Sequence, residues 1–200
     1  MELEMSEGGK NEDIEPTEKF RGGEPDSFCI EADFYEWQGK FAVGTIRMAV
    51  DRYFLGNVNC ASDIASAGRW ARTLFEDRQT ATLYELERVD ASYIAWFFHG
   101  RHVIPRFPRN IIIPSVEPPW PDMKYGYQRN HLHIVGEAAL RDTASIVRLK
   151  QFDNRDRIVA YEYDSESLYE TTVNSEWLDC LLLEFVDWAG GLRRHRIEGR

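Results

Sequence analysis

Short runs in which apolar and polar residues alternate are the feature that most constrains the fold of this 200-residue chain. In SFCIEADFYEW, every second residue from Phe28 to Phe34 is apolar, which is typical of a strand with one buried face. The turn QGK and the run KFAVGTIRMAV follow, so residues 27–50 are predicted to form an antiparallel hairpin. The same reasoning predicts strands in HLHIVGEAAL, ASIVRLKQF, RIVAYEY and LYETTV.

Helical patterns separate these strands. Apolar residues recur at three- and four-residue spacing over residues 64–75, and Ser62 is the predicted N-cap of this helix. Asp90 is predicted to cap a shorter helix, SYIAWFFH, and Ser175 to cap a third helix that ends at residues 190–191. Strands followed by helices predict an α+β fold, in which an antiparallel sheet has its helices packed on one face.

Composition divides the chain into three parts. Residues 1–25 hold eight acids and three bases and are predicted to be a disordered acidic tail. Residues 26–192 are predicted to form a single α+β domain, and residues 193–200 a basic C-terminal end. No signal peptide and no run of eighteen apolar residues is present, so we expect a cytoplasmic protein with no membrane contact.

Charge and motifs narrow the function. The net charge of −10 disfavours direct binding of nucleic acid, which needs cations against phosphate. The sequence contains no P-loop, GxSxG, GxGxxG or HExxH motif. We therefore expect a protein that is not an enzyme and that carries no cofactor.

The segment HLHIVGE offers an alternative interpretation. In a strand, His131 and His133 point to the same side, with Glu137 farther along it, and this donor set suits iron, manganese, nickel or zinc. The stretch GYQRNHLHIVGE resembles the first metal motif of the cupins, which implies a metal-dependent enzyme. It departs from that motif because the gap after Gly126 is one residue short and no PxG turn follows. The simpler interpretation is a sheet strand that carries two histidines.

A long acidic stretch is the stronger functional signal. Residues 158–192 contain eight acids and no Lys or Arg, whereas ordinary surfaces mix charges of both signs. One-signed surfaces attract partners of opposite charge. The predicted surface for a basic protein partner combines the last helix with the hairpin before it, and comprises Glu162, Asp164, Glu166, Glu176, Asp179, Leu183 and Asp187.

Two segments also carry a family resemblance. FYEWQGKFAVGTIRMAVDRYFLGN with the helix ending in WARTLFEDR, and RIVAYEYDSESLYETTV with WLDCLLLEFVDWAGGL, resemble the immunity proteins of bacterial polymorphic-toxin systems. This resemblance implies a non-catalytic protein that binds and neutralises a toxin, which in many such systems is a basic nuclease. A structural or adaptor subunit of a larger assembly is a third possibility.

Overall fold

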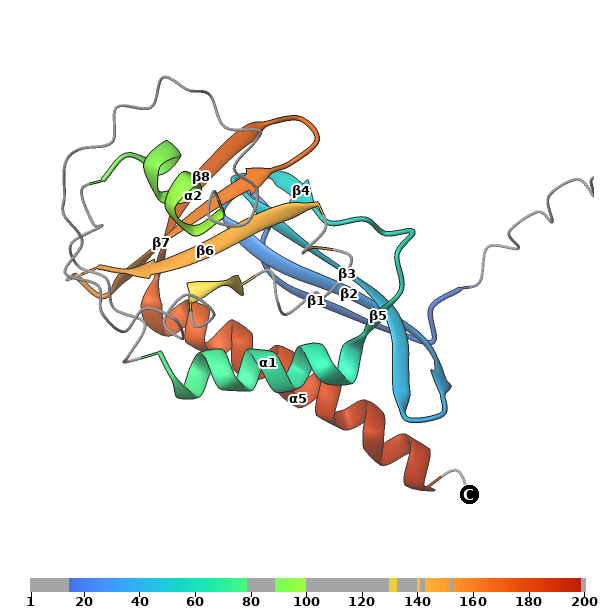
Figure 1. Ribbon diagram of the computed structural model, residues 1–200. Coiled ribbons are helices and arrows are strands. Elements are labelled where there is room, and N and C mark those ends of the chain that lie inside the picture. Colours follow the sequence, from blue (N-terminus) through green and yellow to red (C-terminus); the bar gives the residue numbers. More distant parts are fainter. Residues whose placement is uncertain are drawn as a thin grey trace, which may run out of the picture.

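The computed structural model describes residues 15–78, 89–99, 130–132, 140, 143–151 and 153–198. Within these residues the strands form two antiparallel sheets against which three helices pack (Figure 1). The predicted α+β class and antiparallel pairing are confirmed. The strands divide into two sheets, whereas the sequence pattern predicts a single sheet.

The first sheet is built by the N-terminal half of the chain. Its strands are β1 (Glu18–Glu24), β2 (Phe28–Gln38), β3 (Phe41–Val50), β4 (Tyr53–Leu55) and β5 (Ser62–Asp63). They lie in the order β1-β2-β3-β4, and β5 also pairs with β3. The predicted hairpin is confirmed, since β2 and β3 pair in antiparallel fashion with Phe28 opposite Val50.

The two faces of this sheet differ because the strand period is two. Phe28, Ile30 and Ala32 of β2 point into the core and are almost fully buried. The residues between them lie on the outer face, where charges pair across strands. There the Arg47 Nε donates to Glu31 at 2.6 Å, and an Arg21 Nη donates to Asp33 at 2.6 Å.

The second sheet contains β6 (Ala144–Lys150), β7 (Arg155–Glu162) and β8 (Ser167–Asn174), in that order. Its strands β6 and β7 are buried on both faces. Ile146 and Ile158 contribute to the main core, whereas Val147 and Val159 lie in a second cluster beneath α2 (Ala91–His99). Figure 1 shows α2 on the side of this sheet away from the other two helices.

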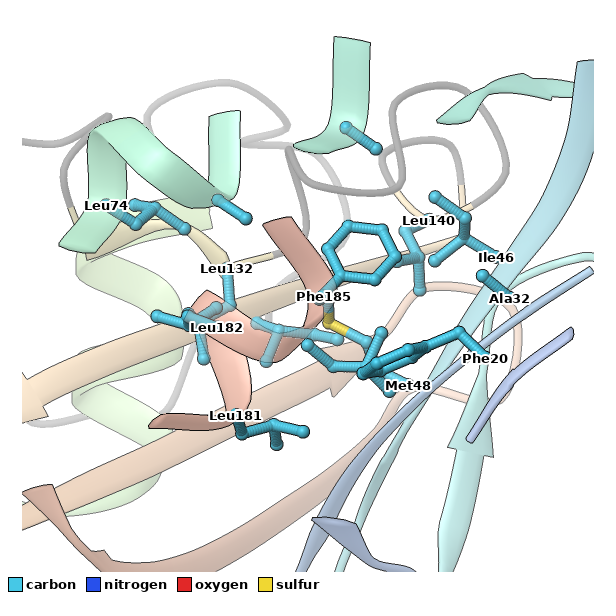
Figure 2. Packing of buried hydrophobic residues seen from close by; sticks show 14 of the residues in the cluster. Phe20, Ala32, Ile46, Met48, Leu74, Leu132, Leu140, Leu181, Leu182 and Phe185 are labelled. Carbon is cyan, nitrogen blue, oxygen red and sulfur yellow. The ribbon is translucent and has the colours of Figure 1, made fainter. Parts of the chain in front are cut away.

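Helices α1 (Ile64–Glu76) and α5 (Ser175–Glu198) lie side by side and run antiparallel (Figure 1). Their apolar stripes cover the inner face of the first sheet. Figure 2 shows Phe185 of α5 close to Met48 of β3 and Phe20 of β1, at the centre of the core. The Phe20 and Phe185 rings meet edge to face, with centroids 5.3 Å apart. This is a favourable geometry for aromatic pairs.

Two predicted helix caps are wrong by one residue. The carboxylate of Asp63, rather than the hydroxyl of Ser62, accepts from Ala65 N at the start of α1. At the start of α5, the Oδ1 of Asn174 accepts from the backbone N–H groups of residues 176 and 177, at 2.9 and 3.1 Å. The Ser175 hydroxyl is buried instead, without a partner among the described residues.

The third predicted cap is confirmed. Asp90 Oδ1 accepts from Ser92 N at 2.8 Å at the start of α2. The hydroxyl and the amide of Ser92 both bond to this carboxylate, and they hold the pKa of Asp90 below its ordinary value.

Two predicted boundaries differ from the structure. Residues 18–24, assigned to a disordered tail, form β1 and pair with β2 along its length. Phe20 anchors this strand in the core, where it contacts Phe185. The last helix does not end at residues 190–191, because neither glycine adopts a positive φ and Leu192 beyond them is buried. Helix α5 therefore includes residues 193–198, which were assigned to a separate basic end.

Gly68 sets how closely α1 and α5 approach. A Cβ on Gly68 would lie 2.7 Å from the Ala189 Cβ, closer than two such atoms can stand. We therefore expect Gly68→Ala to lower the free energy of unfolding by about 1–3 kcal/mol, despite the higher helix propensity of alanine. Gly191→Ala is the matched control, since a Cβ there meets no atom within 4 Å. It should raise stability by about 0.5–1 kcal/mol. Urea unfolding of both variants tests this, and equal effects would contradict the close contact at Gly68.

Candidate functional site

The outward face of α5 carries a row of acidic side chains. Glu176, Glu184 and Asp187 are exposed, and Leu183 lies half-exposed among them. We call these four residues the acidic strip. None of its three carboxylates forms an ion pair with a cation in the described part of the chain. No Lys or Arg occurs from residue 158 to residue 192 that could neutralise them locally.

Asp179 was predicted to belong to this surface, but the structure places it at the interface with α1. Its Oδ1 accepts from an Arg148 Nη at 2.8 Å, and its Oδ2 lies 3.1 Å from Arg78 Nε. The side chain is only 15% exposed. Asp179 therefore stabilises the fold, and its charge is already neutralised within the chain.

Arg148 is the centre of this buried network. The same guanidinium contacts Asp156 of β7, with Nε at 2.8 Å and Nη2 at 2.6 Å from Oδ2. The side chain of Arg148 is 4% exposed and that of Asp156 is fully buried. Through Asp179 and Arg78, the network joins the second sheet to α5 and to the end of α1. We call Arg78, Arg148, Asp156 and Asp179 the buried ion network.

The predicted hairpin residues lie at a distance from the acidic strip. Asp164 and Glu166 are exposed in the turn between β7 and β8, at the end of β8 far from α5 (Figure 1). Eight residues of extended chain span roughly 26 Å, so the turn and the start of α5 are separated by that length of strand. Glu162 accepts from Ser165 Oγ at 2.5 Å and from Tyr169 OH at 3.3 Å. The predicted single surface is therefore two separate acidic regions.

The metal hypothesis rests mostly outside the described residues. His133 and Glu137 lie outside them, and His131 is 7% exposed. The His131 ring packs edge to face on Phe98, with centroids 5.5 Å apart. Its backbone carbonyl accepts from Trp70 Nε1 at 3.3 Å. In the part of the chain that the structure describes, no group of three or more His, Cys, Asp or Glu side chains could hold a metal ion.

The cysteines give no sign of an activated nucleophile among the described residues. Burial raises the pKa of the Cys29 thiol, which keeps it in the less reactive protonated form. Cys180 is exposed on α5, beside the acidic strip. The helices in the described ranges are also too short or too polar to cross a bilayer.

Sequence reasoning missed two residues of this region. Glu184 follows Glu176 and Cys180 at four-residue spacing, so the helical period would have placed it on the exposed face. Arg78 follows α1 directly and gave no such signal, because its partner Asp179 is about 100 residues away in the sequence.

Replacing Arg148 with an apolar residue tests the buried ion network. Arg148→Met leaves Asp156 charged and fully buried without its cation, so we expect a loss of about 3–5 kcal/mol in the free energy of unfolding. The double variant Arg148→Met with Asp156→Leu should recover much of that loss, because no buried charge remains unpaired at this pair. Urea denaturation measures both. A single variant as stable as the parent chain would contradict the role of the network.

Comparison with known proteins finds a solved structure with a similar fold. No protein-family model and no curated protein matches the sequence. Among solved structures, the fold is similar to that of CdiI from Burkholderia dolosa AUO158, a contact-dependent inhibition immunity protein. The TM-score is 0.56 at 15% sequence identity, over 84% of this chain and 99% of that chain. The resemblance to immunity proteins noted in the sequence is thus confirmed at the level of the fold.

Proposed function

We propose that this chain is an immunity protein that binds a toxin and neutralises it. The observation that carries the proposal is the similarity of its fold to CdiI over 84% of this chain and 99% of that chain. The described residues contain no group of three or more side chains that could hold a metal ion, which is compatible with this role.

The acidic strip is the surface that we assign to the toxin. Its carboxylates are exposed and unpaired among the described residues, whereas Asp179 on the same helix is neutralised by two arginines. Unpaired charge of one sign draws a partner of opposite sign and speeds its association by ~10–10³. The toxin is therefore expected to present a basic surface, with an apolar contact opposite Leu183.

The hairpin turn contributes at the margin of the same contact. Asp164 and Glu166 lie roughly 26 Å from the start of α5, about the width of one standard protein interface. Charges at the rim of an interface mostly change the association rate and its salt dependence. We therefore assign steering of the toxin to the turn and most of the affinity to the acidic strip.

Capture of the partner followed by growth rescue tests the function. The tagged chain is used to capture proteins from its native cell extract, with elution in steps of increasing salt. Each captured protein is then expressed in bacteria, alone and together with this chain. We expect a basic protein that arrests growth when alone and is harmless when co-expressed. A partner that does not affect growth would contradict immunity and favour an adaptor role.

Charge reversal tests the surface. The double variant Glu184→Lys with Asp187→Lys should weaken binding of the captured toxin at least tenfold, because two attractions become repulsions. It should also reduce the dependence of affinity on salt, since exposed charge pairs are screened by salt. Titration calorimetry at two salt concentrations measures both effects.

The matched control makes the same change in net charge on another part of the surface. Glu24 is exposed at the end of β1 and Asp26 in the turn that follows, and Glu24→Lys with Asp26→Lys should leave the affinity within twofold of the parent chain. Equal weakening by both double variants would show that overall charge, rather than the acidic strip, governs the contact.

A further inference from the structure

A hollow of about 180 Å³ lies between α1 and α5, next to the acidic strip. Small and apolar residues form most of its lining: Ala65, Gly68, Val186, Ala189 and Gly190. Arg69 and Arg72 of α1 complete it.

The hollow is continuous with the acidic strip. Residues at three- and four-residue spacing lie along one side of a helix. On α5 this side carries Leu183, Val186, Asp187 and Gly190. A partner that covers Leu183 and Asp187 therefore also reaches the opening of the hollow.

Unpaired charges of opposite sign lie in the lining of the hollow, on Arg72, and beside it, on Asp187, which follows the lining residue Val186. On the α1 side, the exposed guanidinium of Arg72 has no ion-pair or hydrogen-bond partner in the described ranges. On the α5 side, the Asp187 carboxylate is equally unpaired among those residues. The arrangement around the hollow is complementary to a segment with an acid on one side and a base on the other.

Gly190 lines the hollow, and packing within the described residues does not require a glycine there. It lies inside α5, where glycine is less favourable than any other residue except proline. A Cβ added to it would meet no atom within 4 Å, so the residue is not required for packing within the chain. Gly68 differs, because it is needed for the contact with Ala189. A bare backbone in open space permits the close approach of another molecule.

We propose that this hollow receives an apolar side chain of the toxin, flanked on the toxin by an acidic residue that pairs with Arg72 and a basic residue that pairs with Asp187. The inference rests on the proposed function and adds the chemistry of the recognised segment. Opposite charges on the two sides fix the direction in which that segment lies across α1 and α5. An apolar side chain between them is anchored in a pocket from which water is excluded, as at the centre of other protein interfaces.

Filling the hollow is the direct test. Gly190→Leu places a side chain where the structure has open space, so the protein should fold, as circular dichroism and thermal unfolding will check. We expect it to weaken binding of the captured toxin at least tenfold in titration calorimetry. Thr172→Leu is the control, because it adds the same apolar side chain at an exposed residue of β8 that belongs neither to the acidic strip nor to the lining of the hollow. Equal affinities of the two variants would overturn the proposal.

A charge test checks the orientation of the toxin segment. Arg72→Glu should weaken toxin binding at least fivefold, whereas Arg52→Glu, the same change in the turn between β3 and β4, should have no effect. If variants at Asp187 lose toxin affinity but variants at Arg72 and Gly190 do not, the proposed function is retained and the hollow is not part of the interface. A captured partner that is not toxic would contradict the proposed function, and these variants would then test the hollow against that partner. Capture of no protein would overturn both proposals.

Discussion

The rest of the structure depends on the ion pairs formed by the buried guanidinium of Arg148. This guanidinium bonds to Asp156 within its own sheet and to Asp179 on α5, which in turn contacts Arg78 at the end of α1. Apolar packing has no fixed direction, so it alone would let α5 slide or rotate on the sheets. Arg148 donates in fixed directions to Asp156 Oδ2 and to Asp179 Oδ1, and these contacts restrict the position of α5 on the second sheet.

The sequence predicted elements whose signal is local. The β2–β3 hairpin followed from alternation in two adjacent runs, and the buried stripe of α5 followed from Leu178, Leu181, Leu182 and Phe185. Strand β1 was missed because its acids and glycines are typical of a disordered segment, and only pairing with β2 orders it. The caps of α1 and α5 were misplaced because two residues that favour capping stand side by side at each site.

The candidate surface was harder to predict because exposure depends on contacts between distant residues. A helical wheel places Asp179 near Glu176 and Leu183, but it cannot show that Arg148 and Arg78 neutralise it. Nor can it show that the turn at Asp164 lies at the far end of β8 from α5. The helical period would, however, have identified Glu184. The sequence shows directly that residues 158–192 contain no Lys or Arg, so acids in this stretch can pair only with cations from elsewhere in the chain, as Asp179 does.

Helix α5 follows every described strand in the chain, and this order affects synthesis. Until residues 175–192 leave the ribosome, the faces of Phe20 and Met48 that pack against Phe185 have no cover. Such incomplete chains expose apolar surface and are prone to aggregate. The helix that closes the core also carries the surface proposed to contact the toxin. Under the proposed function, an incomplete chain would lack the toxin surface as well as part of its core, so protection would begin only once α5 has been made and has docked.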